Sequence, residues 1–473
     1  MIMRKFILIY VSCFLFVLTD HYAVTFNDPQ GSFPKWKAGV ARRVITPEEP
    51  MLMAGYASRN RPSEGTLHEL WAKALALEDL EGKQAVLVTT DLIGFRGSYM
   101  SGRIFDRINK KYGLSRDQFI LSSSHTHTGP ELLRPPEDYL YEGELSGQNS
   151  PEEREKISNY SLRLENIIIE LVGEALNSMV PAQLFSGNGV ARFAVNRRNN
   201  VESELTSVTQ LSGPADHSVP VLKVSGVSGE SIAVVFGYAC HATVLSFYKW
   251  SGDYPGFAQI ALEKAFPGTT AMFFAGAGAD QNPLPRRTVG LAEQYGKSLS
   301  AAVEAIISEP MQELTPALST AYSKIELHFA KLPPTREELL KIIEESSGYP
   351  EYLKIRARIL LNQLKSGRSI ITSYDYPVQF WRIGQQNMVI MGGEVVVDYS
   401  IRLKEIFGEE LFVMAYANEG MGYIPSARII TEGGYEGSGS PVFTTPWASD
   451  IEVSIIHEII RLARQTGLEL YCQ

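Results

Sequence analysis

Short apolar runs that alternate with helical patterns constrain the fold of this chain more than any other feature. Each run is rich in β-forming residues and leads through polar or glycine-rich residues into a helical pattern. The runs cover residues 85–90, 119–122, 232–239, 271–275, 388–391 and 411–416. Strands and helices that alternate in this way build α/β folds. The sequence therefore predicts an α/β fold with a mixed β-sheet core flanked by helices.

The N-terminal segment has the pattern of an export signal. Met1–Lys5 carries two positive charges, and the apolar stretch Phe6–Leu18 is short for a bilayer span but has the length of a signal-peptide core. We expect residues 1–24 to be a signal peptide, with no transmembrane segment beyond it. Residues 25–473 are then expected to form a single exported domain, located in the periplasm, at the cell surface or outside the cell.

Charge and cysteine content exclude two classes of protein. The formal net charge of −9 is spread along the 473 residues, and the sequence has no run of Lys and Arg of the kind that neutralises phosphate groups. We therefore expect a small-molecule or lipid-like substrate and no nucleic-acid partner; the oligomeric state stays open. Only Cys240 and Cys472 follow the predicted signal peptide, so a disulfide framework does not hold this fold.

A charged segment at residues 331–368 has its own helical pattern. It opens with Pro333 and Pro334, and Thr335 with Glu338 three residues later forms a capping box, which starts a helix. Two interpretations fit this segment. One is a helical insertion on the surface, which is where such segments usually lie, and the other is a lid over a site.

Unusual polar residues gather after four of the predicted strands. Each comes shortly after its strand ends: His125, His127, His241, Glu394 and Tyr423. In open α/β sheets, the carboxyl ends of the strands line the crevice that binds ligands. Two or three imidazoles, a carboxylate and a phenol are thus expected at one edge of the sheet.

This set of side chains has the chemistry of a zinc site. Zinc in catalytic sites takes three or four nitrogen and oxygen ligands and keeps or opens one position for water. Bound water then supplies hydroxide near neutral pH. Each residue alone is weak evidence, because a histidine at a strand end commonly forms hydrogen bonds only within its own loop. The combination indicates Zn2+ as the cofactor.

The other histidines of the mature chain have weaker patterns. His328 lies in an alternating strand pattern and His457 in the last helical pattern, so both are expected to be structural. His217 lies in a polar loop. His68 precedes a strand and is a second-tier candidate.

A series of ordered motifs runs from about Lys37 to about Ile460. In order, they are Ala38–Pro47, Met53–Ala57, His125–Pro130, Asn196–Arg197, His241–Thr243, Ser251–Asp253, Gly393–Glu394, and Tyr423 with Tyr435–Gly437. Together they resemble the catalytic domain of the neutral/alkaline (non-lysosomal) ceramidase family. The resemblance is specific because the motifs keep the family's order over most of the chain. It implies a ceramidase-like catalytic domain over residues 25–473.

The resemblance also implies residue roles. His125, His241, Glu394 and Tyr423 match the zinc ligands of the family, and His127, Arg197 and Tyr435 match the groups that surround the scissile amide. The chemistry agrees, because a cation and a phenol stabilise an oxyanion and a second imidazole orients or shuttles a proton. The implied substrate is ceramide or a related N-acyl lipid.

The sequence departs from the family in two places. The family's Gly-Asp-Val-Ser-Pro-Asn segment holds an active-site serine, and this chain has Gly278–Pro283 there, with Gln281 at the serine position. An acyl-enzyme on that serine is not available, so metal-activated water is the expected nucleophile. Asp280 is then expected to be a general base, a residue that supports the metal ligands, or only a turn residue. In addition, full-size ceramidases carry a C-terminal β domain, whereas this chain stops soon after its last predicted helix.

Three functions follow from these observations. The first is a zinc-dependent amidohydrolase that releases a fatty acid and an amine from an N-acyl lipid. The second keeps the metal but acts on a glycan or another polar molecule by hydrolysis or elimination, since Asp280–Asn282 and Arg286–Arg287 suit a sugar or an acidic group. The third is a non-catalytic binding protein that retains the metal. Four convergent ligands argue against the third, because an idle site has no chemical reason to keep them.

Overall fold

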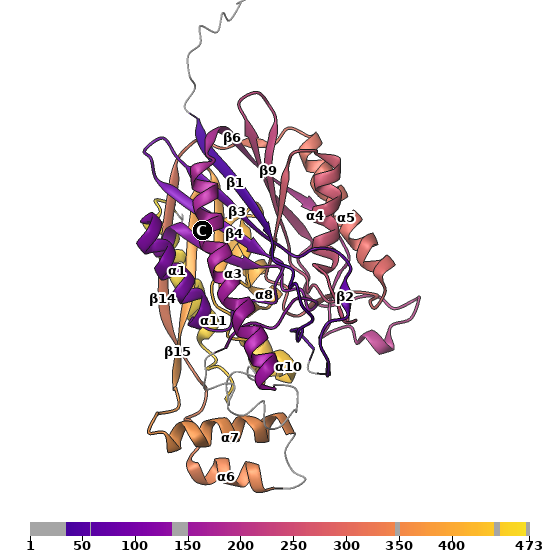
Figure 1. The fold of residues 1–473 in the computed structure, drawn as a ribbon, viewed down its shortest axis with the longest axis vertical. Coiled ribbons are helices and arrows are strands. Elements are labelled where there is room, and N and C mark those ends of the chain that lie inside the picture. Colours follow the sequence, from indigo (N-terminus) through magenta and orange to yellow (C-terminus); the bar gives the residue numbers. More distant parts are fainter. Residues whose placement is uncertain (1–34, 57, 135–149, 346–350, 439–444, 470–473) are drawn as a thin grey trace, which may run out of the picture. The chain divides into compact units, whose positions relative to one another are not determined.

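Two β-sheets packed face to face form the centre of the fold in the computed structural model (Figure 1). The structure describes residues 35–56, 58–134, 150–345, 351–438 and 445–469. The larger sheet has nine strands among these residues. Its order is β11 (Thr270–Ala275), β9 (Ser231–Tyr238), β8 (Ser218–Gly226), β6 (Val180–Val190), β1 (Trp36–Val44), β3 (Trp71–Glu78), β4 (Gln84–Thr90) and β5 (Phe119–Ser123), with β13 (Gln312–Glu313) paired to β6.

The sheets are mixed in strand direction. In the larger sheet only the terminal pairs β11–β9 and β4–β5 are parallel. The smaller sheet has the order β14 (Leu318–His328), β15 (Ser373–Ile383), β16 (Gln386–Met391) and β18 (Phe412–Met414), of which only β16 and β18 are parallel. Three strand pairs stand apart: β2 (Gly65–Thr66) with β10 (Lys249–Trp250), β7 (Ala194–Asn196) with β12 (Gln281–Pro283), and β17 (Glu394–Val395) with β19 (Tyr423–Ile424).

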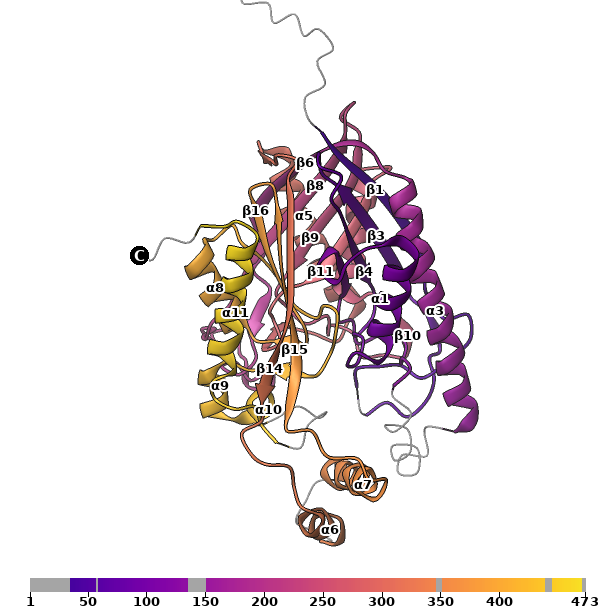
Figure 2. The same cartoon turned by 90° about the vertical axis from the view of Figure 1, so that its left-hand side faces the viewer.

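Helices cover the outer face of each sheet (Figure 2). On the larger sheet these are α1 (Tyr99–Tyr112), α3 (Pro151–Asn177), α4 (Asp253–Ala265) and α5 (Val289–Ser308). On the smaller sheet they are α8 (Val397–Phe407) and α11 (Ile451–Gln465). The short elements η1 (Arg116–Gln118), η2 (Glu202–Glu204), α9 (Ala427–Glu432) and α10 (Gly434–Gly437) lie in connecting segments. The result is a sandwich with four layers, two of sheet inside two of helix.

A core between the sheets holds the two inner layers together. Met272 and Leu87 of the larger sheet share one apolar cluster with Trp381, Met388 and Phe412 of the smaller sheet, and all five are buried. Burying a large apolar side chain stabilises a fold by about 1.5 to 3 kcal/mol. The inner faces are thus fixed to one another, and so are the strand ends that carry the predicted site residues.

Helices α6 (Arg336–Glu344) and α7 (Glu351–Lys365) form a separate pair between β14 and β15. The predicted capping box is present, since Thr335 accepts a hydrogen bond from the backbone of Glu338 and the Glu338 carboxylate accepts one from the backbone of Thr335. The pair has its own apolar cluster, which includes Leu339 and Leu360. The helical character of this segment is confirmed, and its role as a lid stays a prediction.

The sequence located the strands well. All six predicted runs lie on strands β4, β5, β9, β11, β16 and β18, and the expected mixed sheet with flanking helices is confirmed. The last run is shorter than predicted, because regular pairing stops at Met414 and the chain turns at Tyr416, where φ is +53°. The predicted signal peptide and Cys472 lie outside the described residues.

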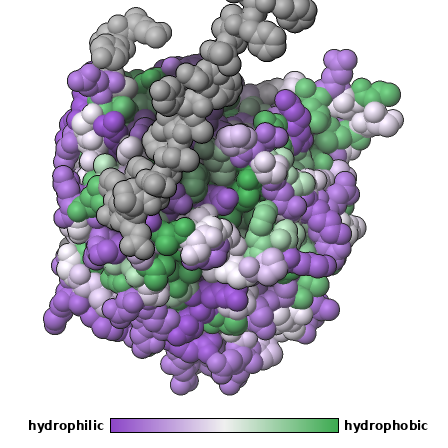
Figure 3. All heavy atoms as spheres, turned by 90° about the horizontal axis from the view of Figure 1, so that it is seen from above, coloured by the Kyte–Doolittle hydropathy of each residue, from purple (hydrophilic) through white to green (hydrophobic). Residues whose placement is uncertain are grey.

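Helix hydropathy and surface composition complete the description of the fold. Among the helices of the described ranges, none combines the length and the apolar character that a bilayer span requires. In the face drawn in Figure 3, hydrophobic residues lie between hydrophilic ones, which is the ordinary mixture of an exposed protein surface. Residues 35–473 form one compact unit by themselves.

Candidate metal centre

Curling of the larger sheet brings the first two site residues together. His125 follows β5 at one edge of the sheet, and His241 follows β9, which is six strands away in the order of the sheet. In a flat sheet, six steps of about 4.8 Å would separate these strands by roughly 29 Å. Here the edge strands β5 and β11 contact each other, and the two imidazole ring centroids lie only 4.9 Å apart.

The segment that follows β18 closes the gap between the two edges. Ala415 donates a backbone hydrogen bond to Ala275 at the end of β11, over 2.9 Å, and Ala417 forms a bridge with Ser122 of β5. Between them, Tyr416 places its ring 4.3 Å from that of His125. The segment that follows β18 of the smaller sheet therefore lines the centre and connects the two histidine-bearing edges of the larger sheet.

Three imidazoles meet at this point. The possible ligand nitrogens of His125, His127 and His241 lie within 4.8 Å of one another. The Nε2 atoms of His125 and His127 are 3.2 Å apart. His125 and His241 are buried, whereas His127 is partly exposed.

The hydrogen bonds of the Nδ1 atoms distinguish His127 from the other two histidines. Nδ1 of His125 lies 2.7 Å from the carbonyl oxygen of Ile93, and Nδ1 of His241 lies 3.2 Å from that of Gly278. A metal-binding histidine commonly donates its second ring N–H to a carbonyl group, which leaves Nε2 free as a ligand. Nδ1 of His127 is buried without a hydrogen-bond partner among the described residues, so His127 lacks this support.

Glu394 adds a carboxylate to the centre. Its Oε2 atom lies 3.4 Å from Nε2 of His125 and 3.4 Å from Nε2 of His241. Gly393 precedes it with φ of +74°, and a Cβ atom there would come within 2.6 Å of the sulfur of Met421, so the approach to Glu394 requires glycine. Burial by itself raises the pKa of Glu394, but the two histidines more than offset this and hold it well below its usual range.

Tyr423 stands beside Glu394 because the short strands β17 and β19 pair them directly. The register places Glu394 opposite Tyr423 in this parallel pair. The Tyr423 hydroxyl accepts a hydrogen bond of 3.1 Å from Nη2 of Arg197. Burial, and after it the charge of Glu394, raises the pKa of Tyr423 well above its ordinary value, so the phenol keeps its proton in this arrangement.

Arg197 and Tyr435 lie on the outer side of Tyr423. The guanidinium carbon of Arg197 is 5.6 Å from the ring centroid of Tyr423 and 5.6 Å from that of Tyr435. The two tyrosine rings are 5.2 Å apart. Tyr435 is 68% exposed, which sets it apart from the buried ligand candidates.

Asp280 and Gln281 are both buried behind the centre. The two carboxylate oxygens of Asp280 accept hydrogen bonds from the backbone of Val397 (2.8 Å) and from the side chain of Asn196 (2.9 Å). Both oxygens are thus engaged in holding α8 and β7, which favours a supporting role over that of a base. The Gln281 amide nitrogen donates to the Ala239 carbonyl, and its Oε1 atom has no partner among the described residues.

Other predicted positions lie outside the centre. His328 and His457 lie on β14 and α11, as expected. His217 contacts the carbonyl oxygen of Ala194 over 2.9 Å. His68 lies 3.0 Å from the hydroxyl of Ser251, which supports the loop of His125 through bonds to Thr126, so its role is indirect.

Sequence reasoning missed residues that support the centre. Tyr416 packs on His125, and Tyr56 packs on His127 with ring centroids 5.0 Å apart. Arg59 donates to the carbonyl oxygen of His127 over 2.6 Å. Tyr56 lies within a recognised motif, which was the available signal. Tyr416 and Arg59 had none, because their contacts depend on distant segments.

Backbone strain also concentrates around the centre. Three non-glycine residues here have left-handed backbone angles: His125 (φ +58°), Tyr416 (+53°) and Asn418 (+62°). Such conformations cost about 1 to 3 kcal/mol each and persist where the surroundings enforce them.

The residues present fit a bound zinc ion. Nε2 of His241 is buried without a hydrogen-bond partner among the described residues, although its ring is held by Gly278. Burial, and after it the charge of Arg197, lowers the pKa of His241 to about 4, so the ring is neutral at pH 7 and offers a lone pair. A buried acceptor aimed at a second imidazole and a carboxylate is the donor set that zinc takes.

One family model matches more than half of this chain. The model of the N-terminal part of the neutral/alkaline non-lysosomal ceramidases matches residues 36–305. This chain belongs to that family. The match ends before Glu394, Tyr423 and Tyr435, so these three predicted residues lie outside it.

Curated ceramidases match about half of this chain. Neutral ceramidase A of Dictyostelium discoideum is 23% identical over 265 residues, which are 52% of this chain and 35% of that protein. The neutral ceramidase of Drosophila melanogaster is 30% identical over 245 residues, which are 49% of this chain and 32% of that protein. The matched region thus spans about a third of the length of these relatives.

Solved ceramidase structures share the fold over nearly the whole chain. The neutral ceramidase from Pseudomonas aeruginosa has a TM-score of 0.70 and 19% identity, and the match covers 93% of this chain and 76% of that chain. A ceramidase complexed with C2 has a TM-score of 0.69 and 18% identity, covering 93% and 77%. The expected ceramidase-like fold is therefore confirmed, including the smaller sheet beyond residue 305.

Proposed function

We propose that this protein is a zinc-dependent amidohydrolase that cleaves the amide bond of ceramide or of a related N-acyl lipid. The observation that carries the proposal is the convergence of two Nε2 atoms and one carboxylate oxygen, each from a different strand end, with 3.4 Å between Glu394 and each of His125 and His241. Membership of the ceramidase family supports the substrate class.

Four residues would hold the metal: His125, His241, Glu394 and Tyr423. When bound there, zinc supplies a Lewis acid for the amide carbonyl and acidifies a water molecule. The carbonyl groups of Ile93 and Gly278 keep the two imidazoles in the orientation in which Nε2 is the ligand.

The remaining groups act on the substrate. Arg197 and Tyr435 donate hydrogen bonds to the carbonyl oxygen as negative charge develops on it. His127 takes the proton of the attacking water and delivers it to the nitrogen of the leaving amine. Burial, and after it the charges of His125 and His241, lowers the pKa of His127 well below its ordinary value, so the imidazole starts in the neutral form that accepts a proton.

Gln281 changes the mechanism relative to a serine-based one. An amide side chain is not a nucleophile, so water attacks the carbonyl directly and no acyl-enzyme forms at this position. Gln281 instead provides a buried hydrogen-bond acceptor, Oε1. Asp280 accepts hydrogen bonds from the backbone of Val397 and the side chain of Asn196 and so has a supporting role.

Export completes the proposal. We place the site of action in the periplasm, at the cell surface or outside the cell, because residues 1–24 have the charge and apolar pattern of a signal peptide. Fractionation of cells that express the full chain tests this: the protein should appear outside the cytoplasm, shortened at its N-terminus. A full-length protein retained in the cytoplasm would contradict it.

A product screen tests the reaction. Zinc-loaded protein (residues 25–473) is incubated separately with N-dodecanoyl sphingosine, N-dodecanoyl ethanolamine and acidic oligosaccharides, and the products are identified by mass spectrometry. We expect free dodecanoate and the amine from the lipids, and none from the His241→Ala variant. Cleavage of sugars alone, above all with an unsaturated product, would overturn the amidase in favour of the glycan enzyme. Absence of any turnover would favour a binding protein.

A further inference from the structure

Glu436 is a buried carboxylate that joins two consecutive arginines. Its side chain is 3% exposed and lies on α10, directly after Tyr435. Oε1 accepts a hydrogen bond of 2.8 Å from Nε of Arg197, and Oε2 accepts one of 2.7 Å from Nη1 of Arg198. Each oxygen thus holds a different guanidinium group, and charge-assisted bonds of this kind are the strong ones.

The bond to Glu436 controls how Arg197 is turned. Nη2 of Arg197 donates to the Tyr423 hydroxyl, and Nη1 has no hydrogen-bond partner among the described residues. A guanidinium group is planar, so fixing Nε and Nη2 fixes the plane and the direction of the Nη1 hydrogens. With Glu436 in place, the unused donors of Arg197 have one orientation beside Tyr423.

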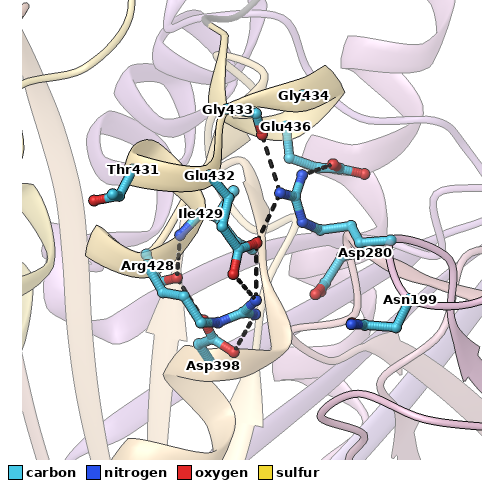
Figure 4. A network of polar contacts seen from close by, with 12 residues as sticks. Asn199, Asp280, Asp398, Arg428, Ile429, Thr431, Glu432, Gly433, Gly434 and Glu436 are labelled. Atoms are coloured by element: carbon cyan, nitrogen blue, oxygen red, sulfur yellow. Dashed lines mark hydrogen bonds and ion pairs between the residues drawn. The ribbon is translucent and has the colours of Figure 1, made fainter.

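A second set of contacts holds the α9–α10 segment independently of Arg197. Arg198 donates to Glu432 and to the carbonyl oxygen of Gly433, both over 3.0 Å, and Arg428 bridges Glu432 and Asp398. Figure 4 shows Arg428 between Asp398 and Glu432, with Gly433 and Glu436 on the far side of Glu432. The segment therefore stays attached without the charge of Glu436, whereas Arg197 then keeps only its bond to Tyr423.

We propose that Glu436 is a positioning residue that holds the Arg197 guanidinium in the orientation that stabilises negative charge on the substrate carbonyl oxygen. This inference rests on the proposed function. The α10 helix, which carries Tyr435, is held separately by the contacts of Arg198 and Arg428, so the effect of Glu436 runs through Arg197. Glu436 does not itself touch the substrate.

The test compares two glutamates of the same network in two backgrounds. Glu436→Gln and the control Glu432→Gln are each made in the wild-type chain and in Arg197→Met, and kcat and KM are measured with N-dodecanoyl sphingosine. We expect Glu436→Gln to lower kcat about 10- to 100-fold with KM changed by no more than about threefold, as for loss of one oriented donor. Glu432→Gln should change kcat by no more than about threefold.

The Arg197→Met background separates positioning from structure. If Glu436 acts through Arg197, Glu436→Gln should lower kcat by no more than about twofold once Arg197 is absent, because coupled residues are not additive. Zinc content should stay at the wild-type level in all variants. As a readout without turnover, the affinity for dodecanoate, measured by calorimetry, should fall by a similar factor in Glu436→Gln and Arg197→Met.

Two results would overturn the inference. One is an unchanged kcat in Glu436→Gln, and the other is the same decrease in both backgrounds, which is what a purely structural role produces. Lack of turnover by the wild-type protein would instead contradict the proposed function. The dodecanoate affinities then decide the inference by themselves, since equal affinities of wild type and Glu436→Gln would refute it.

Discussion

The inner and outer sides of the centre are built in different ways. On the inner side, His125, His241 and Glu394 follow strands directly, and backbone carbonyl groups orient the two imidazoles. On the outer side, Arg197 and Tyr435 lie on connecting segments that ion pairs hold together. The inner geometry therefore depends on strand register, and the outer geometry depends on charge. Substitutions and changes of pH should affect the two sides differently.

The largest effect is expected from the inner ligands. His241→Ala and Glu394→Ala should each lose zinc and lower kcat/KM at least about 1,000-fold, because each removes a donor and leaves buried groups without a partner. Elemental analysis and steady-state kinetics measure the two losses. His127→Gln is the matched control. It should keep its zinc and lose only rate, since Nδ1 of His127 has no partner among the described residues that would orient the ring as a ligand. Loss of metal in this variant would make His127 a ligand.

A smaller effect is expected at Gln281, which lies behind the inner ligands without being one of them. Gln281→Ala removes the bond to the Ala239 carbonyl and the Oε1 atom, which has no hydrogen-bond partner in the described part of the chain. The loss should be about 1 to 3 kcal/mol, divided between the free energy of unfolding and kcat/KM, with zinc content unchanged. Complete loss of activity with a normal fold would give Gln281 a direct part in the chemistry.

The outer side should respond to pH in its stability. Burial by itself raises the pKa of Glu436, but Arg197 and Arg198 more than offset this and lower it below its ordinary value of 4.5. A depressed folded-state pKa gives stability that is fully present above the unfolded-state pKa and is lost as pH falls through the folded-state pKa. Glu436→Gln should therefore lower the free energy of unfolding by about 2 kcal/mol at pH 7, and by less as the pH falls from 4.5 through the folded-state pKa.

Denaturant unfolding at a series of pH values measures this difference. Glu432→Gln serves as the control. Glu432 also forms ion pairs with arginines of this network, Arg198 and Arg428, but its side chain is 45% exposed. A difference between wild type and Glu436→Gln that stays constant down to pH 3 would show that charge does not hold the outer side.

The smallest effect is expected from the α6–α7 pair, which takes part in neither side. His328 and Ser373 face each other in the β14–β15 register, so the two ends to be joined lie side by side when residues 332–370 are replaced by a short Gly-Ser linker. Because the pair has its own apolar cluster, zinc content should not change and the thermal midpoint should shift by no more than about 3 °C. Loss of turnover of long-chain but not short-chain N-acyl substrates would support the lid.

The inner side was predictable from sequence because its information is local. A histidine or glutamate directly after an apolar run has a defined place at the end of a strand, and His125, His241 and Glu394 all have that place. What the sequence could not give is the curling of the larger sheet. His125 and His241 follow strands that are far apart in the sheet order, and the contact between β5 and β11 brings them together.

The outer side was harder to predict because its contacts join distant segments. Arg197 and Tyr435 were found only through a resemblance of motifs, and Glu436 was seen merely as part of the last motif. Nothing in the local pattern shows that one carboxylate accepts from both Arg197 and Arg198. Similarly, the left-handed backbone of Tyr416 is not readable from its neighbours, which continue a β-forming run.

The contact between β5 and β11 has a consequence for folding kinetics. The proposed ligands follow strands of both sheets and come from both halves of the chain, so no fragment that lacks the smaller sheet can assemble the centre. Contacts between such distant segments form late and slow the folding of a chain. Under the proposed function, a zinc ion held by ligands from these distant segments would bind only the assembled centre, so it would lengthen the lifetime of the native state against proteolysis.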